Sequence, residues 1–388
     1  MKSEWTRVPL SRVAEVQTGP FGSQLHNKDY VTEGTPIVTV EHLGSRSFTT
    51  QNLPCVSEED RSRLAKYSLN TGDIVFSRVG SVDRCSYVNE ANAGWLFSGR
   101  CLRVRSTNIH PEFLYYFFCQ EQVKEYVKSI AVGATMPSIN TKLLNDVEVI
   151  LPPLPIQRKI ASILSALDDK IATNNAICRN LEEQAEAIFS QYYQKENEPR
   201  LFTSLIQISG GGTPKTSEPS FWNGNIPFFT PKDAESPFAF TTEKTLTEEG
   251  LNNCSSILYP EWTTFITARG TVGKISLAGR AMAMNQSCYA LISEEIHPLL
   301  IYFYALVVVK SLKQKASGAV FDAIVTRDFD REEIKLLKKD EQQLLLMRIE
   351  PIYTQIRSLK LENLKLAETR SALISKLMSG ELPIDAIN

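Results

Sequence analysis

The segment PIQRKIASILSALDDKIATNNAICRNLEEQAEAIFSQYY, from Pro155 to Tyr193, decides the fold because its pattern occurs a second time in the chain. The second copy is DEQQLLLMRIEPIYTQIRSLKLENLKLAETRSALISKLMSGEL, from Asp340 to Leu382. Aligning Gln157 with Gln342 gives a period of 342 − 157 = 185 residues. This period is much longer than a solenoid unit, which has a few tens of residues. We therefore expect a globular domain and a long helix that are each present twice.

Both copies predict long helices, because their apolar residues recur mostly at steps of three and four. In the first copy these residues are Ile156, Ile160, Ile163, Leu167, Ile171, Ile177, Leu181, Ala185 and Ile188, and in the second they are Leu344, Met347, Ile352, Ile356, Leu359, Leu366, Leu373 and Leu377. Asn174 stands where an apolar residue is expected, and a buried asparagine can fix the register of a coiled coil. Each helix should be about 60 Å long. The rest of the chain cannot cover such stripes, so the helices should pack against each other in antiparallel orientation.

The globular parts repeat more weakly. His110–Tyr116 aligns with His297–Phe303, and Ser77–Val82 aligns with Thr267–Val272. Short β-rich runs predict strands at Pro36–Val40, Asp73–Ser77 and Cys101–Arg105, and a helix is predicted at Pro111–Val127. The expected fold class is α+β. It consists of two similar globular domains separated by two long antiparallel helices that form a coiled coil, with a pseudo-twofold internal repeat.

Proline-rich and polar stretches mark the domain boundaries. The sequence Leu151-Pro152-Pro153-Leu154-Pro155 ends the first domain, because proline cannot continue a strand ladder and restricts the residue before it. Glu196-Asn197-Glu198-Pro199 ends the first long helix. The predicted parts are a first globular domain (1–153), a central long helix (154–197), a second globular domain (198–339), a C-terminal long helix (340–380) and a tail (381–388).

Composition gives only broad limits. Of the 388 residues, 43% are apolar and 22% are charged, which is ordinary for a soluble globular protein, and the formal charge of −2 does not exclude nucleic acid. The seven cysteines are scattered, which favours reduced, mostly buried thiols. The longest apolar run, Leu299–Val309, is too short to span a bilayer. We therefore expect a cytoplasmic protein without a membrane association.

Motifs of catalysis are absent from the sequence. The string nearest to a phosphate-binding loop, Gly270-Thr271-Val272-Gly273-Lys274-Ile275, has the wrong spacing and lacks the hydroxyl residue after lysine. There is no Gly-x-Gly-x-x-Gly after a strand, no Asn-Pro-Pro-Tyr, no His-Glu-x-x-His and no Gly-x-Ser-x-Gly. The four histidines lie far apart in the sequence. We expect no catalytic residues, no metal site and no cofactor bound by this chain.

Two polar, glycine-rich loops are the remaining candidates for a functional surface. Gly19–Gln24 and Gly210–Lys215 occupy equivalent places early in each domain. Glycine-rich backbone can present N–H groups to phosphate oxygens, and a tight turn without a ligand explains these strings equally well. Further residues follow a predicted strand in each half. Arginine forks read guanine and side-chain amides read adenine, so these residue types suit nucleic-acid recognition.

The candidate DNA-binding residues are Ser23, Gln24, Lys28, Arg78, Ser81, Arg84 and Arg100 in the first half, and Thr213, Lys215, Lys232, Arg269, Thr271, Lys274, Asn285 and Gln286 in the second. Any one of these residues, taken alone, is also explained by an ordinary solvated surface.

The whole chain resembles the specificity subunit of type I restriction-modification systems. The resemblance covers the order of domains and helices and several local strings. These are Gly-Pro-Phe-Gly-Ser from Gly19, Leu-Pro-Pro-Leu-Pro-Ile-Gln-Arg-Lys-Ile from Leu151, Gly-Gly-Gly-Thr-Pro from Gly210, Phe-Trp-Asn-Gly-Asn-Ile-Pro from Phe221, and Asp-Glu-Gln-Gln from Asp340. Together these strings are specific, whereas each alone is weak.

The resemblance implies a non-catalytic subunit in which each globular domain reads one half of a split, asymmetric target in double-stranded DNA. It also implies that two modification subunits dock on the helices, which set the spacer between the half-sites. Those partners would supply adenine methylation with S-adenosylmethionine. Restriction subunits, which are motor-nucleases using ATP and Mg, would join them in the full complex.

Three alternatives remain at this stage. The chain could be the specificity chain of a type IIB-like restriction enzyme, which shares this architecture but has a different partner. It could itself be a nuclease or methyltransferase, which the missing cofactor and metal motifs oppose. It could also belong to a different class, as a coiled-coil adaptor that binds proteins through its two globular parts.

Overall fold

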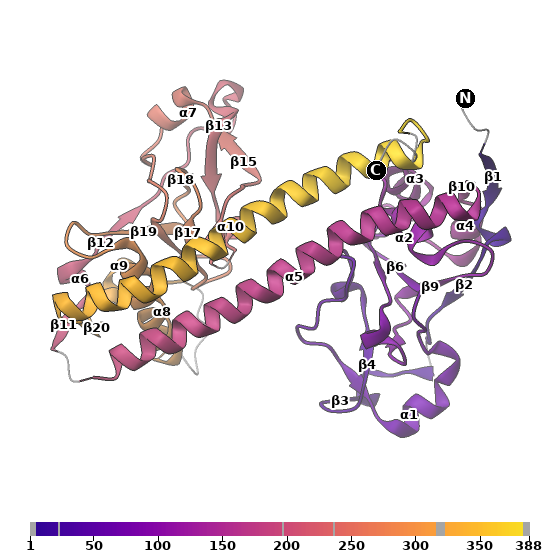
Figure 1. Cartoon of the computed structure of the whole chain (residues 1–388), viewed down its shortest axis with the longest axis horizontal. Coiled ribbons are helices and arrows are strands. Elements are labelled where there is room, and N and C mark those ends of the chain that lie inside the picture. The colour runs from indigo at the N-terminus through magenta and orange to yellow at the C-terminus, as the bar shows by residue number, and fades with distance from the viewer. Residues whose placement is uncertain (1–4, 22–23, 196–197, 236, 316–322, 383–388) are drawn as a thin grey trace. The chain divides into compact units, whose positions relative to one another are not determined.

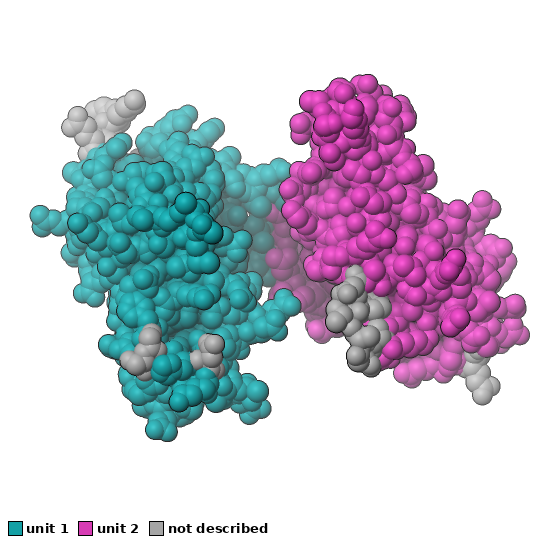
Figure 2. Space-filling view, turned by 180° about the vertical axis from the view of Figure 1, so that it is seen from behind, with its two compact units in different colours: residues 1–172, 364–388 teal, residues 173–363 magenta. Residues whose placement is uncertain are grey.

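The computed structural model describes residues 5–21, 24–195, 198–235, 237–315 and 323–382. It forms two compact units, which Figure 2 distinguishes by colour. Unit 1 comprises residues 1–172 and 364–388, and unit 2 comprises residues 173–363. Each unit therefore combines one globular part with stretches of both long helices.

The core of unit 1 is built on an antiparallel sheet in the order β2-β9-β6-β7. Its strands are β2 (Ala14–Thr18), β9 (Cys101–Ser106), β6 (Ile74–Ser77) and β7 (Cys85–Tyr87). All four residues of strand β6 are buried, and successive side chains of a strand point to opposite sides, so β6 is buried on both faces. Ile74 and Phe76 lie in the core shared with the helices, and Val75 lies in a second core.

A second sheet in unit 1 has the order β3-β5-β4-β8. Its strands are β3 (Tyr30–Val31), β5 (Cys55–Val56), β4 (Thr35–Val38) and β8 (Leu96–Phe97), and β4 runs parallel to β8. The remaining elements are the ribbon of β1 (Thr6–Pro9) and β10 (Glu148–Leu151) and the helices α1 (Glu58–Arg63), α2 (Pro111–Cys119), α3 (Glu121–Ile130) and α4 (Thr141–Asn145).

Unit 2 contains a sheet in the order β12-β19-β16-β17-β14 and a second one in the order β15-β13-β18. The strands are β12 (Gln207–Gly210), β13 (Trp222–Phe229), β14 (Phe238–Ala239), β15 (Lys244–Leu246), β16 (Thr264–Thr267), β17 (Ile275–Ala278), β18 (Ala283–Met284) and β19 (Cys288–Ile292). The ribbon of β11 (Pro199–Leu201) and β20 (Glu333–Lys335) and the helices α6 (Phe202–Leu205), α7 (Glu248–Asn252), α8 (Pro298–Lys315) and α9 (Thr326–Phe329) complete it.

The internal repeat is confirmed strand by strand. The order β2-β9-β6-β7 corresponds to β12-β19-β16-β17, and the parallel pair β4 and β8 corresponds to the parallel pair β13 and β18. One side-chain bond follows the 185-residue period. Gln157 Nε2 donates to Pro152 O at 2.7 Å, and Gln342 Nε2 donates to Leu337 O at 2.8 Å. The expected α+β fold with two similar globular parts is therefore correct.

Several element boundaries differ from expectation. The helix expected at 111–127 is divided at Gln120, whose backbone is extended and whose amide donates to Phe117 O at 3.0 Å. Strand β4 ends at Val38, because Val40–His42 forms a 3-10 helix. The long helices are α5 (Leu154–Tyr193) and α10 (Lys339–Met378), so the first is shorter than the expected 154–197. Residues 196–197 and 383–388 lie outside the described residues.

In each unit a stretch of α5 and a stretch of α10 lie side by side and run in opposite directions (Figure 1). The expected apolar stripe of α10 was wrong at its start. Leu344 and Met347 are 54% and 74% exposed, whereas Leu345 and Ile349 are buried. Three consecutive leucines made the period ambiguous there. In α5, Ile177 is likewise exposed and its neighbour Cys178 is buried.

Asn174 lies in the contact between the helices, as expected. It is fully buried, and its Nδ2 atom donates to Glu362 Oε2 and to Asn363 Oδ1, both at 2.9 Å. Asn363 Nδ2 in turn donates to Asn175 Oδ1 at 3.0 Å. Any slip in register would leave these amides buried without partners, which is costly. This polar group therefore favours one alignment of α5 with α10.

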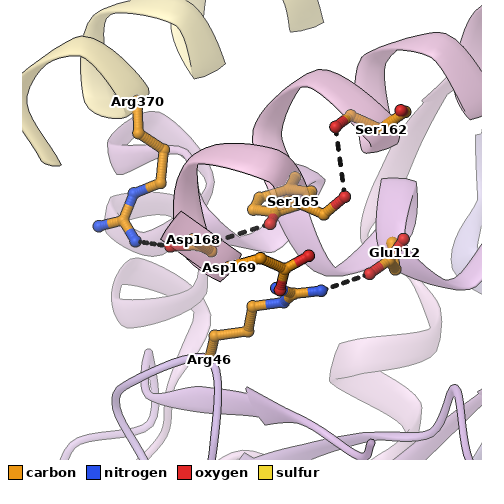
Figure 3. A network of polar contacts seen from close by, with 8 residues as sticks. Arg46, Glu112, Ser162, Ser165, Asp168, Asp169 and Arg370 are labelled. Carbon is orange, nitrogen blue, oxygen red and sulfur yellow. Dashed lines mark hydrogen bonds and ion pairs between the residues drawn. The ribbon is translucent and has the colours of Figure 1, made fainter. Parts of the chain in front are cut away.

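A polar network joins the long helices to the globular part of unit 1 (Figure 3). Asp168 on α5 is 7% exposed, pairs with Arg370 of α10, and accepts a hydrogen bond from the Tyr116 hydroxyl at 2.7 Å. Burial and the carboxylate together raise the pKa of Tyr116 far above its usual value, so the phenol remains a donor. Beside this pair, Arg46 reaches both Asp169 and Glu112 at 2.5 Å.

Replacing Asp168 should destabilise unit 1 strongly. Asp168→Ala leaves the Arg370 guanidinium and the buried Tyr116 hydroxyl without their acceptor, which should cost about 2–3 kcal/mol. Asp169→Ala is the matched control, because its side chain is 67% exposed and Arg46 keeps Glu112, so its cost should stay below about 1 kcal/mol. Urea unfolding of both full-length variants measures the difference. Equal costs would contradict a structural role for the buried carboxylate.

Candidate nucleic-acid interface

Three loops of unit 1 meet at one end of the β2-β9-β6-β7 sheet. They are residues 19–21 after β2, residues 78–84 between β6 and β7, and residues 98–100 before β9. Arg78 N donates to Arg100 O at 2.8 Å, and Gly19 N donates to Cys101 O at 3.2 Å. The loops approach so closely that a Cβ on Gly19 would lie 2.1 Å from Ser98 O, so only glycine fits there.

Arg78 is the best-held cation of this loop group. Its Nη1 atom donates to Gly99 O at 3.2 Å, and its guanidinium carbon lies 5.0 Å from the centre of the Phe21 ring. Its Nε atom is buried and has no hydrogen-bond partner among the described residues. A guanidinium stacked on a ring and held at one nitrogen loses little freedom when its other donors bind a ligand. Arg78 is therefore suited to a directional contact.

The other candidates of unit 1 are less uniform. Ser81, Arg84 and Arg100 are exposed on the same loops. Gln24 N donates to Phe21 O at 3.3 Å, but its side chain accepts a hydrogen bond from the Tyr67 hydroxyl at 2.6 Å. Lys28 is exposed in a 3-10 helix, Asn27–Asp29, that leads into β3. Ser23 lies outside the described residues.

Unit 2 presents a matching group of loops at the same end of its larger sheet. Ala268 N donates to Ser287 O at 2.8 Å, as Arg78 N does to Arg100 O in unit 1. A Cβ on Gly211 would lie 2.2 Å from Asn285 O, so the glycine-rich loop again passes close to its neighbour. The Thr213 hydroxyl donates to Gln286 Oε1 across these two loops. The sequence-predicted residues Thr213, Asn285 and Gln286 are thus brought together.

The remaining candidates of unit 2 surround this group. Arg269, Thr271 and Lys274 are exposed on the loop between β16 and β17. The Thr271 hydroxyl donates to Pro231 O at 3.3 Å, which connects this loop to the segment that contains Lys232. The Lys232 ammonium lies 3.4 Å from Glu243 Oε2, so part of its charge is already compensated. Lys215 is exposed on the glycine-rich loop.

Sequence reasoning missed the apolar part of this surface. Phe21, Val132 and Met136 are exposed large apolar residues of unit 1. Val132 and Met136 belong to a segment that two backbone hydrogen bonds hold to the loop 78–84. Gly80 N donates to Pro137 O at 2.8 Å, and Ile139 N donates to Arg78 O at 2.9 Å. Isolated apolar residues give no periodic signal, so only the tertiary structure could have placed Phe21 against Arg78 and the segment of Val132 and Met136 against the loop 78–84. Apolar side chains here could contact thymine methyl groups.

Other site classes have little support. In the ranges that the model describes, no three His, Cys, Asp or Glu side chains are placed to hold a metal ion, and all seven cysteines are free. No helix in those same ranges is both long enough and apolar enough to cross a bilayer. Burial raises the pKa of the Cys101 thiol to about 12, so this cysteine near the loops is a poor nucleophile.

Comparison with known proteins points to one family. The model of the type I restriction modification DNA specificity domain matches residues 2–183 and, a second time, residues 194–368. The putative type I restriction enzyme MjaX specificity subunit of Methanocaldococcus jannaschii is 24% identical, over 98% of this chain and 94% of that protein. The type I restriction enzyme HindI specificity subunit of Haemophilus influenzae is 21% identical, over 84% of this chain and 89% of that protein.

A solved structure agrees on the fold. The crystal structure of a type I restriction-modification system S subunit from M. genitalium superposes with a TM-score of 0.59, at 14% identity and over 96% of both chains. Identity this low supports the fold alone. The two family matches together cover most of the sequence. This chain therefore belongs to the family of type I restriction modification DNA specificity domains, and it carries the domain twice.

Proposed function

We propose that this chain is the DNA-specificity subunit of a type I restriction-modification complex and that it has no catalytic activity of its own. The observation that carries the proposal is the doubled specificity domain, with a matching group of loops at the same sheet end in each copy. Two copies of one scaffold with different loop side chains suit a target that consists of two different half-sites. Relatives along nearly the full length are named as specificity subunits, which supports the same function.

The proposal assigns residues 1–153 and 198–339 to the two target-recognition domains. The fifteen loop residues predicted from the sequence are the candidate DNA contacts, with Arg78 and the Thr213, Asn285 and Gln286 group as the strongest. Loop cations such as Arg84, Arg100 and Lys274 suit phosphate contacts, which fix position, whereas Arg78 and the amides suit base edges.

Partners supply the chemistry in this proposal. Two modification subunits dock on the helices and methylate adenine with S-adenosylmethionine. Restriction subunits, which use ATP and Mg, complete the complex. Because chromosomal DNA is the substrate, the complex works in the cytoplasm. The long helices act as a ruler that sets the unread spacer between the half-sites.

The first prediction concerns methylation in cells. Expressing this chain with its neighbouring methyltransferase should create one split, non-palindromic motif that contains N6-methyladenine, because each recognition domain reads a different half. Single-molecule mapping of modified bases on genomic DNA measures this, with the methyltransferase alone as the control. If no motif depends on this chain although the complex is folded and active, the protein-binding adaptor hypothesis takes its place.

Arg78 should be more sensitive to a change of cation than Arg100. Arg78→Lys keeps the charge but loses the bidentate fork, so affinity for the target should fall by about 10- to 100-fold, as expected for a lost base contact of about 1–3 kcal/mol. Arg100→Lys, on the adjacent strand end, should change affinity less than threefold if Arg100 contacts phosphate. Competition binding of the complex to duplexes that carry the mapped motif tests this. The opposite ranking would reject the assignment of Arg78 to base reading.

Helix length should control the spacer. Inserting four residues after Ala172 in α5 and after Asn363 in α10 lengthens both helices by about 6 Å where the chain passes between the units. The mapped motif should keep both half-sites and gain about two base pairs of spacer, at about 3.4 Å each. The same insertion after Leu382 is the control. An unchanged spacer, or altered half-sites, would count against the ruler.

A further inference from the structure

A lysine at the end of a helix contacts the loop after the central strand in each unit. In unit 1, Lys128 Nζ on α3 lies 3.1 Å from Asp83 Oδ2, in the loop 78–84 between β6 and β7. In unit 2, Lys313 Nζ on α8 donates to Gly273 O at 2.7 Å, in the loop 268–274 between β16 and β17. The two contacts have different acceptors, a carboxylate and a backbone carbonyl.

The two lysines and the two acceptors occupy equivalent positions of the repeat. Lys128 and Lys313 are 313 − 128 = 185 residues apart, the period that also relates Gln157 to Gln342. Asp83 and Gly273 follow the matching strings Arg78–Val82 and Ala268–Val272 directly. The lysine is therefore common to both halves although the residue that it reaches has changed. A lysine that contacts the same part of the matching loop in both halves indicates a shared task.

The acceptors differ for a steric reason. Gly273 has a φ of +73°, and a Cβ there would lie 2.5 Å from Lys313 Cε. A side chain at position 273 would thus displace the lysine, and the loop offers its carbonyl oxygen instead. Asp83 is not among the described residues with positive φ, and it offers its carboxylate. In both units the lysine reaches the part of the loop directly before Arg84 or Lys274, which are candidate DNA contacts.

Other bonds hold both ends of each loop to its strand. At the end of the loop, Ser77 N donates to Arg84 O at 2.9 Å in unit 1, and Gly273 N donates to Thr267 O at 2.8 Å in unit 2. At its beginning, further bonds are present. The Ser77 hydroxyl donates to Val79 O at 2.8 Å, and Gly80 N donates to Pro137 O at 2.8 Å. In unit 2 the Thr267 hydroxyl donates to Thr271 O. The lysine adds a polar contact from a helix, α3 in unit 1 and α8 in unit 2, to the end of the loop. Loss of this contact should therefore leave the strands and the loop backbone bonds in place and loosen the attachment of the loop end to the helix.

We propose that Lys128 and Lys313 are positioning residues, each of which sets the recognition loop of its own unit through Asp83 or Gly273 and thereby controls the reading of one half-site. The proposal rests on the proposed function. It differs from the obvious alternative, in which an exposed lysine near DNA simply binds a phosphate. Lys128 acts on DNA through the loop, and its ammonium is already engaged by the Asp83 carboxylate.

Asp83 distinguishes these two roles by the sign of its effect. If Lys128 bound a phosphate, Asp83→Asn would release the lysine and remove a negative charge, so DNA affinity would rise. If Lys128 positions the loop, Asp83→Asn and Lys128→Met should weaken discrimination in the same half-site, by about two- to fivefold each, as expected for a partly exposed ion pair. The double variant should then lose no more than either single variant.

The experiment uses the complete complex in two assays. Genomic methylation maps from cells that express each variant show which half of the motif becomes degenerate. Lys128→Met and Asp83→Asn should relax one half-site, and Lys313→Met should relax the other. Competition binding to duplexes with the wild-type motif at several salt concentrations gives the salt slope, which a lost phosphate contact would lower by about 0.9. We expect the slope to stay unchanged in all three variants.

Two controls keep the outcomes apart. Lys124→Met removes a cation of the same helix that pairs with Glu121 at 3.8 Å, and it should change neither half-site. Lys128→Arg should restore most of the discrimination, because a guanidinium can still reach Asp83. If Asp83→Asn raises affinity, or if Lys128→Met lowers the salt slope with intact half-site fidelity, the positioning role is rejected. If the wild-type complex itself methylates no split motif, the proposed function fails instead.

Discussion

The burial of one face along α5 and α10 is the constraint on which the rest of the molecule depends. Each helix has 40 residues, several times the usual length in globular proteins, and its apolar face cannot stay in water. In unit 1, Ile160 and Leu164 of α5 share one core with Ile374 and Leu377 of α10 and with the buried aromatic residues of α2. Each unit therefore needs two stretches of chain that lie far apart in the sequence.

The repeat keeps this packing arrangement while its chemistry changes. Asp168 of α5 corresponds to Tyr353 of α10, 185 residues later, and Arg370 corresponds to Ala185. In unit 1 the carboxylate binds Arg370 and the Tyr116 hydroxyl, whereas in unit 2 Tyr353 packs 5.5 Å from the Phe303 ring. An aromatic cluster avoids the desolvation cost of a buried ion pair, and a charge network penalises misalignment more strongly. The two ends of the helix pair thus reach a similar geometry by different means.

Much of this architecture could be predicted from the sequence, because it follows from period and length. The duplicated helices, the α+β class and the role of Asn174 needed only the apolar pattern. The exact face of α10 could not be predicted, since Leu344, Leu345 and Leu346 fit two stripes equally well. The break at Gln120, where the backbone is extended and the side-chain amide bonds back to Phe117 O, has no apolar signature.

The residues of the candidate site were likewise only partly predictable from the sequence. Loops after matching strands could be paired by alignment, so Arg78, Ser81 and Arg84 were found together with Arg269, Thr271 and Lys274. Phe21, Val132 and Met136 could not be found, because their nearness to the loop 78–84 depends on tertiary contacts between segments that lie apart in the sequence. Gln24 and Lys232 were chosen for their chemistry, but the Tyr67 hydroxyl and Glu243 already engage them.

The loop framework explains how one scaffold can carry two different surfaces. Arg78 N binds Arg100 O and Ile139 N binds Arg78 O, and the equivalent bonds in unit 2 run from Ala268 N to Ser287 O and from Ile324 N to Ala268 O. All four are backbone bonds, so they form whatever side chains stand at these positions. An arginine pair in one unit can therefore be an alanine and a serine in the other without loss of the framework. Backbone bonds maintain the loop shape, and this leaves the side chains available to differ between half-sites.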